Sequence, residues 1–292
     1  MTAKNRKRFA LDVIINPSAF LFERGQLDEI QKILRQFAPQ WTKQARRWLS
    51  RANQEAVDLE ESGAIEFQIR KDEERLSNSR ISAILGEQMK AQGVPKAKPR
   101  FLGGVEMRSN DDSLTVIVRA DEYLLAPSAG RWLFGNEIAL QIRRSKIESK
   151  DSIAWAEEIF EAICAAISPL HGVVHTWDEY DSKNMSHEGG GLEAVGVDAS
   201  KHLSGIYWLN FFGKPYLDLI GSEVLLTAPA VKACKLDEGV MIKLDDDPRH
   251  WTSAKYKETE KRVLQHIGEK YFFSKEEPKK ITKAPAFEYY GS

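Results

Sequence analysis

The sequence predicts an α+β fold in which one or more mainly antiparallel sheets are packed by helices. Runs rich in β-branched and aromatic residues recur along the chain, and few of them alternate strictly with helices as a doubly wound parallel sheet requires. A hairpin signal supports the antiparallel arrangement. The strand-like runs 232–236 and 240–244 flank Asp237-Glu238-Gly239, where we expect Gly239 to supply a positive φ.

In the N-terminal half, apolar residues alternate over 9–15, which predicts a strand, and recur at helical spacing over 27–37. The segment 41–59 is ambiguous, although the spacing of Ala45, Trp48, Leu49 and Ala52 fits a helix. A brief alternation over 64–70 predicts a strand, and 75–92 predicts a helix closed by Gly93. Residues 94–100, with two prolines and three basic residues, are a candidate linker.

Farther along, residues 114–118, 137–142 and 173–180 have the composition of strands. Asp151 or Ser152 can cap a helix that runs to Ile167. The aromatic run 205–213 predicts a largely buried strand, followed by one helix that begins at Pro215 and ends before Pro229. Thr252 or Ser253 can cap a last helix that ends at Gly268.

Composition restricts the class of protein. With 292 residues, 42% hydrophobic and 29% charged, the chain can bury a sizeable core. We expect a single domain over 1–273, with a candidate sub-boundary at 94–100, and a basic tail over 274–292. A net charge of −1 gives no global basic field for nucleic acid. Cys164 and Cys234 lie in apolar surroundings typical of reduced, buried thiols.

The sequence also bears on location. No apolar run approaches the roughly 20 residues that span a bilayer, so we expect no membrane partner. The basic N-terminus lacks the apolar block and small-residue cleavage site of a signal peptide. We therefore expect a cytoplasmic protein.

Several short segments resemble a known family. They are Gly-Ile-Tyr-Trp-Leu-Asn-Phe-Phe-Gly at 205–213, Leu-Ile-Gly at 219–221, Ala-Pro-Ala at 228–230 and Asp-Asp-Pro-Arg-His-Trp at 246–251. Together they resemble the bacterial polymorphic-toxin immunity protein fifty-two family, most specifically over 200–273, and 48–56 is similar more loosely. The resemblance implies an antitoxin that binds a secreted nuclease toxin of restriction-endonuclease-like fold, often delivered by type VI secretion. It would also allow a short strand near Trp48.

A second hypothesis is a metal-dependent hydrolase that uses His171, His175, Asp178 and His187. Zinc proteases of the His-Glu-x-x-His type need a helix and a Glu after the first His, whereas Gly172 and two valines here favour a strand. Positions four apart on a strand do share a face, so the site stays open. The commoner role of a histidine on such a strand is that of a hydrogen-bonded structural residue.

Other catalytic signatures are absent from the sequence. The run His187-Glu188-Gly189 has no matching Gly-x-Ser-x-Gly elbow, and neither a phosphate-binding P-loop nor a Gly-x-Gly-x-x-Gly fingerprint occurs. We therefore expect no catalytic residue, no metal and no cofactor.

Two segments are rich in acidic residues. Between 171 and 200 six acids stand against Lys183, and between 236 and 248 five acids stand against Lys243. Such runs are most often solvated loops. Alternatively, an acidic surface flanked by aromatic residues could bind a nuclease, because a nuclease must present Lys and Arg to the phosphates of its substrate. The candidate toxin-binding residues are Trp177, Asp178, Glu179, Tyr180, Asp181, Glu188, Asp245, Asp246, Asp247 and Trp251.

The leading hypothesis is thus a non-enzymatic antitoxin whose partner is a nuclease protein, and the hydrolase is the alternative. A third hypothesis is an adaptor protein of a secretion machine that docks through helices within 27–92.

Overall fold

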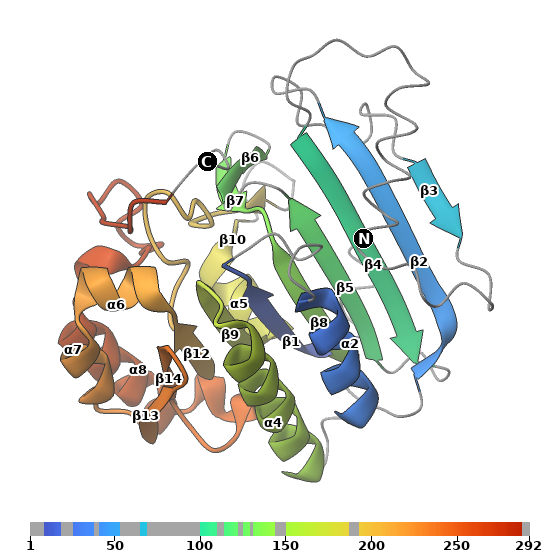
Figure 1. Ribbon diagram of the computed structural model, residues 1–292. Helices are drawn as coiled ribbons and strands as arrows, with labels where there is room; N and C mark the ends of the chain where they lie inside the picture. The colour runs from blue at the N-terminus through green and yellow to red at the C-terminus, as the bar shows by residue number, and fades with distance from the viewer. Residues whose placement is uncertain are drawn as a thin grey trace.

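The computed structural model describes residues 9–18, 26–37, 41–52, 65–68, 100–109, 114–121, 125–128, 131–143, 150–186 and 193–287. A ten-stranded sheet dominates this part (Figure 1). Its strands are β1 (Phe9–Asn16), β2 (Trp41–Ala52), β3 (Ile65–Gln68), β4 (Arg100–Ser109), β5 (Leu114–Asp121), β8 (Glu137–Arg143), β9 (His171–Thr176), β12 (Leu209–Phe212), β13 (Lys232–Leu236) and β14 (Gly239–Lys243).

The strands lie in the order β13-β14-β12-β9-β1-β8-β5-β4-β2-β3, and every neighbouring pair is antiparallel. Two small hairpins join β6 (Leu125–Ser128) to β7 (Arg131–Phe134) and β10 (Met185–Ser186) to β11 (Glu193–Ala194). The helices are α2 (Gln26–Phe37), α4 (Lys150–Ile167), α5 (Trp177–Asn184), α6 (Lys214–Ile220), α7 (Ser222–Leu226) and α8 (Ala254–Ile267), with 3-10 turns η3 (Pro248–Thr252) and η4 (Glu269–Tyr271). The predicted α+β class is confirmed.

Helices cover both faces of the sheet around β12. On one face α2 and α4 lie side by side, and their apolar residues form one core with residues such as Val13 and Phe211 (Figure 1). On the opposite face α6, α7 and α8 form a second core with residues such as Phe212 and Ile242. Successive residues of a strand point to opposite faces, so Phe211 and Phe212 enter different cores.

Several predicted elements are confirmed with small shifts of their ends. They include the strands at 9–15, 64–70, 114–118 and 137–142, the helix at 27–37, and the hairpin of β13 and β14. The last helix is confirmed as α8. The Ser253 hydroxyl accepts the Tyr256 N–H at 3.2 Å as its N-cap, and Gly268 ends the helix with φ of 114°.

The ambiguity at 41–59 is resolved in favour of the strand that the resemblance allowed near Trp48, because Trp41–Ala52 forms β2. β2 pairs with β3 on one side and β4 on the other, and this two-sided pairing outweighs a local helical spacing. The strand β4 was not predicted. Its central Gly103-Gly104 lacks the side chains that mark a strand in sequence.

The predicted strand 173–180 ends early, at Thr176, where α5 begins. The Thr176 hydroxyl accepts the Glu179 N–H at 3.1 Å and so caps this helix. The strand predicted at 205–213 pairs only over Leu209–Phe212, because Asn210 bonds both backbone polar groups of Tyr207 instead.

Two turns also differ from prediction. The single helix expected from Pro215 is divided into α6 and α7 at Gly221, whose φ is 102°. In the β13–β14 turn the positive φ, 49°, belongs to Asp237 rather than Gly239. Gly239 is required for a different reason, since an added Cβ would lie 2.1 Å from Cζ of Phe211. Helix α4 begins at Lys150, so neither Asp151 nor Ser152 precedes it as a cap.

The C-terminal strap, residues 273–287, packs on the rest of the molecule. The Phe273 N–H donates to the Leu203 carbonyl at 2.9 Å, and the Lys283 N–H donates to the Lys270 carbonyl at 2.8 Å. Phe287 is buried, with its ring edge-on to Phe134 at a centroid distance of 5.6 Å. The strap therefore joins the hairpin β6–β7 to the second core.

Other expectations have different outcomes. Cys164 is buried and Cys234 partly buried, and neither forms a disulfide. The helices seen in the described ranges are all too short or too polar to cross a membrane. The helix predicted at 75–92 and residues 94–99 of the candidate linker lie outside the described residues.

Replacing Gly239 by Ala should lower the free energy of unfolding by about 1–3 kcal/mol, because the new methyl group would collide with the Phe211 ring. Chemical denaturation measures this loss. Glu238→Ala, at the exposed neighbouring position, is the matched control and should change stability by less than about 0.5 kcal/mol. Equal stability of the two variants would contradict the close packing at Gly239.

Candidate functional site

The strand order brings the two predicted acidic segments to one edge of the sheet. Both β9 and β14 pair antiparallel with β12, where Leu209 faces Val174 on one side and Lys243 on the other. The two outer strands therefore run in the same direction and end together. Since neighbouring strands lie about 4.8 Å apart, the chain leaves them roughly 10 Å apart. We name residues 177–181 and 245–251 together the acidic edge.

The first segment of the acidic edge is the start of α5. Asp178 is exposed, whereas Trp177, Tyr180 and Asp181 are partly exposed. Tyr180 stacks on the buried His175 ring at a centroid distance of 5.0 Å, and Trp177 lies 5.7 Å from Tyr180. These aromatic rings hold the first turn of α5 against the end of β9.

The second segment is a closed loop. Asp245 and Asp247 are only 5% and 9% exposed. One Asp245 carboxylate oxygen accepts the Asp247 N–H at 3.1 Å and contacts His250 Nδ1 at 2.9 Å. Asp247 accepts the Arg249 N–H and side chain, and these hydrogen bonds lower the pKa of Asp247. The Trp208 indole donates to the Asp245 carbonyl at 2.6 Å, which ties the loop to β12.

Seven of the ten predicted binding residues separate into two groups, and Tyr180 and Asp181 are partly exposed. Asp246, with 83% of its side chain exposed, and Asp178 project toward solvent, beside the partly exposed Trp177 and Trp251. In contrast, Glu179, Asp245 and Asp247 are buried and organise the local structure. The expectation that all these acids form one surface is corrected for those three residues. Glu188 lies outside the described residues.

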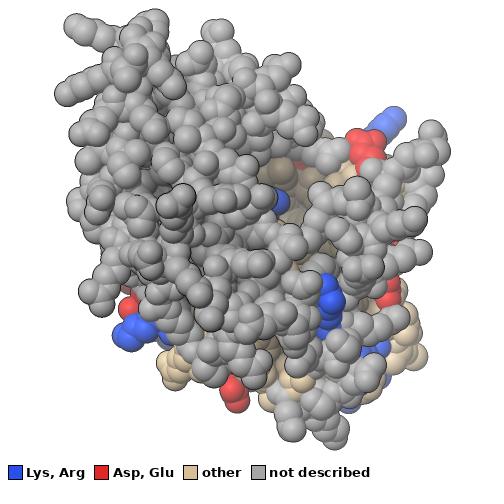
Figure 2. Space-filling view, turned by 90° about the vertical axis from the view of Figure 1, so that its right-hand side faces the viewer, with Lys and Arg blue, Asp and Glu red and all other residues tan. Residues whose placement is uncertain are grey.

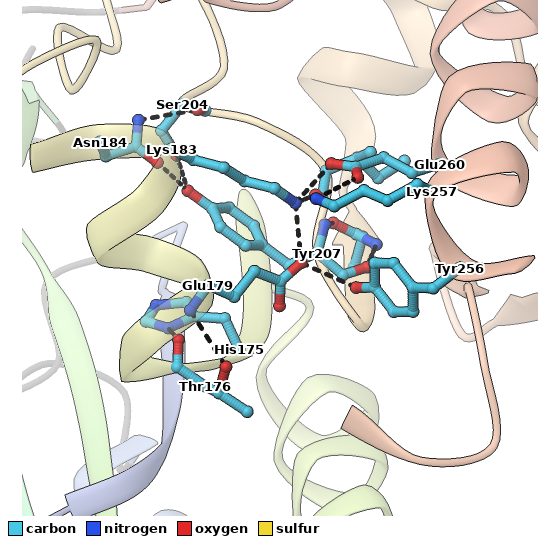
Figure 3. A network of polar contacts seen from close by, with 12 residues as sticks. His175, Thr176, Glu179, Lys183, Asn184, Ser204, Tyr207, Tyr256, Lys257 and Glu260 are labelled. Atoms are coloured by element: carbon cyan, nitrogen blue, oxygen red, sulfur yellow. Dashed lines mark hydrogen bonds and ion pairs between the residues drawn. The ribbon is translucent and has the colours of Figure 1, made fainter. Parts of the chain in front are cut away.

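Glu179 belongs to a buried polar network, drawn in Figure 3. The Lys183 ammonium donates to a Glu179 oxygen at 2.7 Å and to the Ile206 carbonyl at 2.6 Å, and it pairs with Glu260 at 2.5 Å. The Tyr256 hydroxyl donates to the same Glu179 oxygen at 2.8 Å. The sequence gives no local sign of this network, because Tyr256 lies 77 residues from Glu179 and only the Glu179–Lys183 spacing is local.

Burial and charge oppose each other in this network. Burial raises the pKa of Glu179, and the nearby Lys183 offsets only part of that rise. Burial by itself would lower the pKa of Lys183, but the carboxylates of Glu179 and Glu260 outweigh it and raise that pKa. Lys183 is therefore held as an ammonium ion whose hydrogens are engaged, which makes it unsuitable as a nucleophile or base.

A cavity of about 540 Å³ lies between α5, α8 and the C-terminal strap. Lys183 and Glu260 form part of its wall, and further Lys and Glu side chains of α8 and the strap line the remainder. The wall of the cavity therefore carries charges of both signs. Figure 2 shows the side that carries β2 and β3, where the described part contributes only scattered charged side chains of either sign.

His171 and His175 of the alternative hypothesis share one face of β9, as predicted, but they point into aromatic surroundings. His171 lies 5.5 Å from Tyr216 and 5.8 Å from Phe212 between ring centroids, and His175 lies 5.0 Å from Tyr207. Burial lowers the pKa of His171 to about 3 and that of His175 to about 4, so both rings are neutral near pH 7.

The described residues contain no group of three or more His, Cys, Asp or Glu side chains that could hold a metal ion. His171 and His175 are buried, whereas Asp178 is exposed on α5. His187 lies outside the described residues. The structure thus does not gather the three described members of the predicted metal site.

Comparison with known proteins gives a likeness of fold to solved structures. No family model and no curated protein matches the chain. Among solved structures, it is similar to the Pseudomonas aeruginosa T6SS protein PA0821, with a TM-score of 0.44 and 10% sequence identity. The likeness covers 87% of this chain and 73% of that chain. The function is therefore inferred from the residues of this chain.

The buried histidines predict a loss of stability in acid. Their pKa values are depressed below 6.5 in the native state, so their contribution is present above pH 6.5 and is lost as the pH falls toward 4. The free energy of unfolding should decrease by about 2 kcal/mol per histidine between pH 6.5 and about pH 5.

The variants His171→Phe and His175→Phe should each lack the decrease in the free energy of unfolding that the replaced histidine causes in acid. Denaturant titrations at several pH values measure it, and His266→Phe, on the exposed face of α8, is the control. An unchanged acid slope in the first two variants would refute the assignment.

Proposed function

We propose that this protein is an immunity protein that binds a cognate secreted nuclease toxin and neutralises it in the producing cell. The observation that carries the proposal is the common ending of β9 and β14 at one sheet edge. This arrangement makes one surface from two acidic, aromatic segments that are far apart in sequence. The resemblance of 200–273 to an immunity family, whose toxins are often delivered by type VI secretion, supports the same function.

The chemistry of the acidic edge suits such a partner. A nuclease presents lysines and arginines to the phosphates of its substrate. Exposed carboxylates such as Asp178 and Asp246 can occupy that field, and partly exposed aromatic rings such as Trp177 and Trp251 can anchor the contact. Complementary charges also accelerate encounter. The proposed partner is thus a basic protein surface, and neither nucleic acid nor a membrane is proposed as a partner.

Neutralisation by binding requires no chemical step in this chain. The toxin would be inhibited either because its active site is covered or because it is distorted, and no cofactor enters either route. The proposed place of action is the cytoplasm, where a nuclease would reach its substrate.

The double variant Asp178→Lys/Asp246→Lys should bind the proposed nuclease partner at least about tenfold more slowly at low salt, because it reverses the charge of two exposed carboxylates of the acidic edge. Its association rate should also depend less on ionic strength. Stopped-flow association over a series of salt concentrations measures both effects, and a nuclease assay reports protection.

Glu238→Lys is the matched control, since Glu238 is an exposed acid on the β13–β14 turn at the opposite edge of the sheet. It should leave association nearly unchanged. If both variants associated alike, the acidic edge would not be the interface. If the wild-type protein bound no neighbouring nuclease, the proposed function itself would fail.

A further inference from the structure

Helix α5, which carries half of the acidic edge, has partly exposed aromatic rings in its first turn but no buried apolar residue. A surface helix is normally held by an apolar stripe that faces the core. In α5, whose sequence is Trp-Asp-Glu-Tyr-Asp-Ser-Lys-Asn, the buried residues are Glu179 and Asn184, and both are 0% exposed. Beyond the aromatic contacts of its first turn, the helix is therefore held at its buried face by polar side chains.

One polar anchor holds the middle of α5 to α8. The Lys183 ammonium joins Glu179 of its own helix to Glu260 of α8, and the Tyr256 hydroxyl bonds Glu179 from α8 as well (Figure 3). Lys183 also bonds the Ile206 carbonyl at 2.6 Å. All these partners are at hydrogen-bond distance, so the anchor is directional.

A second polar anchor holds the C-terminal end of α5. The Asn184 amide donates to the carbonyls of Ser204 at 2.8 Å and Val195 at 3.2 Å, and its oxygen accepts the Tyr207 hydroxyl. From the C-terminal strap, the Lys275 ammonium donates to the carbonyls of Ser182 and Met185 at 2.8 and 2.6 Å. A cation at this position also suits the negative end of the helix dipole.

Buried ion pairs are an inefficient source of stability. Moving two charges out of water costs free energy, and the attraction between them often only cancels that cost. A protein in which apolar residues of similar volume replace the pair can therefore be equally stable. Here the cost is not fully offset, because no hydrogen bond from a described residue reaches the second carboxylate oxygen of Glu179. What such pairs supply is a fixed geometry, since each bond has a required direction.

We propose that the ion network of Glu179, Lys183, Tyr256 and Glu260 is a positioning device that fixes the orientation of α5 and thereby the geometry of the acidic edge. Lys183 is its central positioning residue. The partner that binds the oriented surface is the basic nuclease. This inference rests on the proposed function for its partner. The orientation of α5 itself can be measured on the protein alone.

An apolar variant separates positioning from stability. It carries the four substitutions Glu179→Leu, Lys183→Met, Tyr256→Phe and Glu260→Leu, which fill similar volume and leave no charge in the network. We expect it to melt at or above the wild-type temperature, because the desolvation cost is removed. The amide hydrogens of α5 should nevertheless exchange faster, while those of α4 keep wild-type protection.

The same variant should release the nuclease at least about tenfold faster, because a less ordered surface fits its partner less well. Association should change by less than about threefold, because the exposed charges of Asp178 and Asp246 remain. Glu258→Leu/Lys261→Met, at exposed positions of α8, is the matched control and should behave as wild type in both measurements.

Tyr256→Phe gives a milder test that keeps the ion pairs and removes one hydrogen bond. It should raise exchange in α5 and speed dissociation to a smaller degree than the apolar variant. If the apolar variant showed both the wild-type rate of amide exchange in α5 and the wild-type rate of dissociation from the nuclease, the positioning role would be overturned. Failure of the wild-type protein to bind a nuclease would instead overturn the proposed function, while the exchange data would still decide whether the network orients α5.

Discussion

The short strand β12 is the constraint on which the rest of this structure depends. Its four residues are buried on both faces, so it can only lie in the interior of the sheet, between β9 and β14. Phe211 contributes to the core under α2 and α4, whereas Phe212 contributes to the core under α6, α7 and α8. The antiparallel pairing on both sides then determines that β9 and β14 end at the same edge.

Acidic residues in this chain have two distinct physical roles. Asp245 and Asp247 accept backbone N–H groups and so build the loop on which Asp246 projects. Such carboxylates are bound by hydrogen bonds and are not available to a partner. A dense acidic sequence is therefore compatible with a small number of exposed charges, and the exposed ones are placed by the buried ones.

The buried ionisable groups are structural in the same sense. His171 and His175 are kept neutral by burial among aromatic rings, and Lys183 is kept charged by two carboxylates. These states hold the interior of the protein in place, and the polar attachment of α5 connects the acidic edge to that interior.

The sequence by itself determined the α+β class, the limits of the first strand and the last helix, and the presence of two acidic, aromatic segments. Apolar alternation, helix-capping residues and glycines at helix ends are local signals. Their effect does not depend on how the rest of the chain folds. Only the tertiary structure decided that β2 is a strand, that the two segments share an edge, and which acids are buried. Strand pairing and burial depend on residues far away in sequence, as in the bond from Tyr256 to Glu179 across 77 positions, and no local pattern records such a contact.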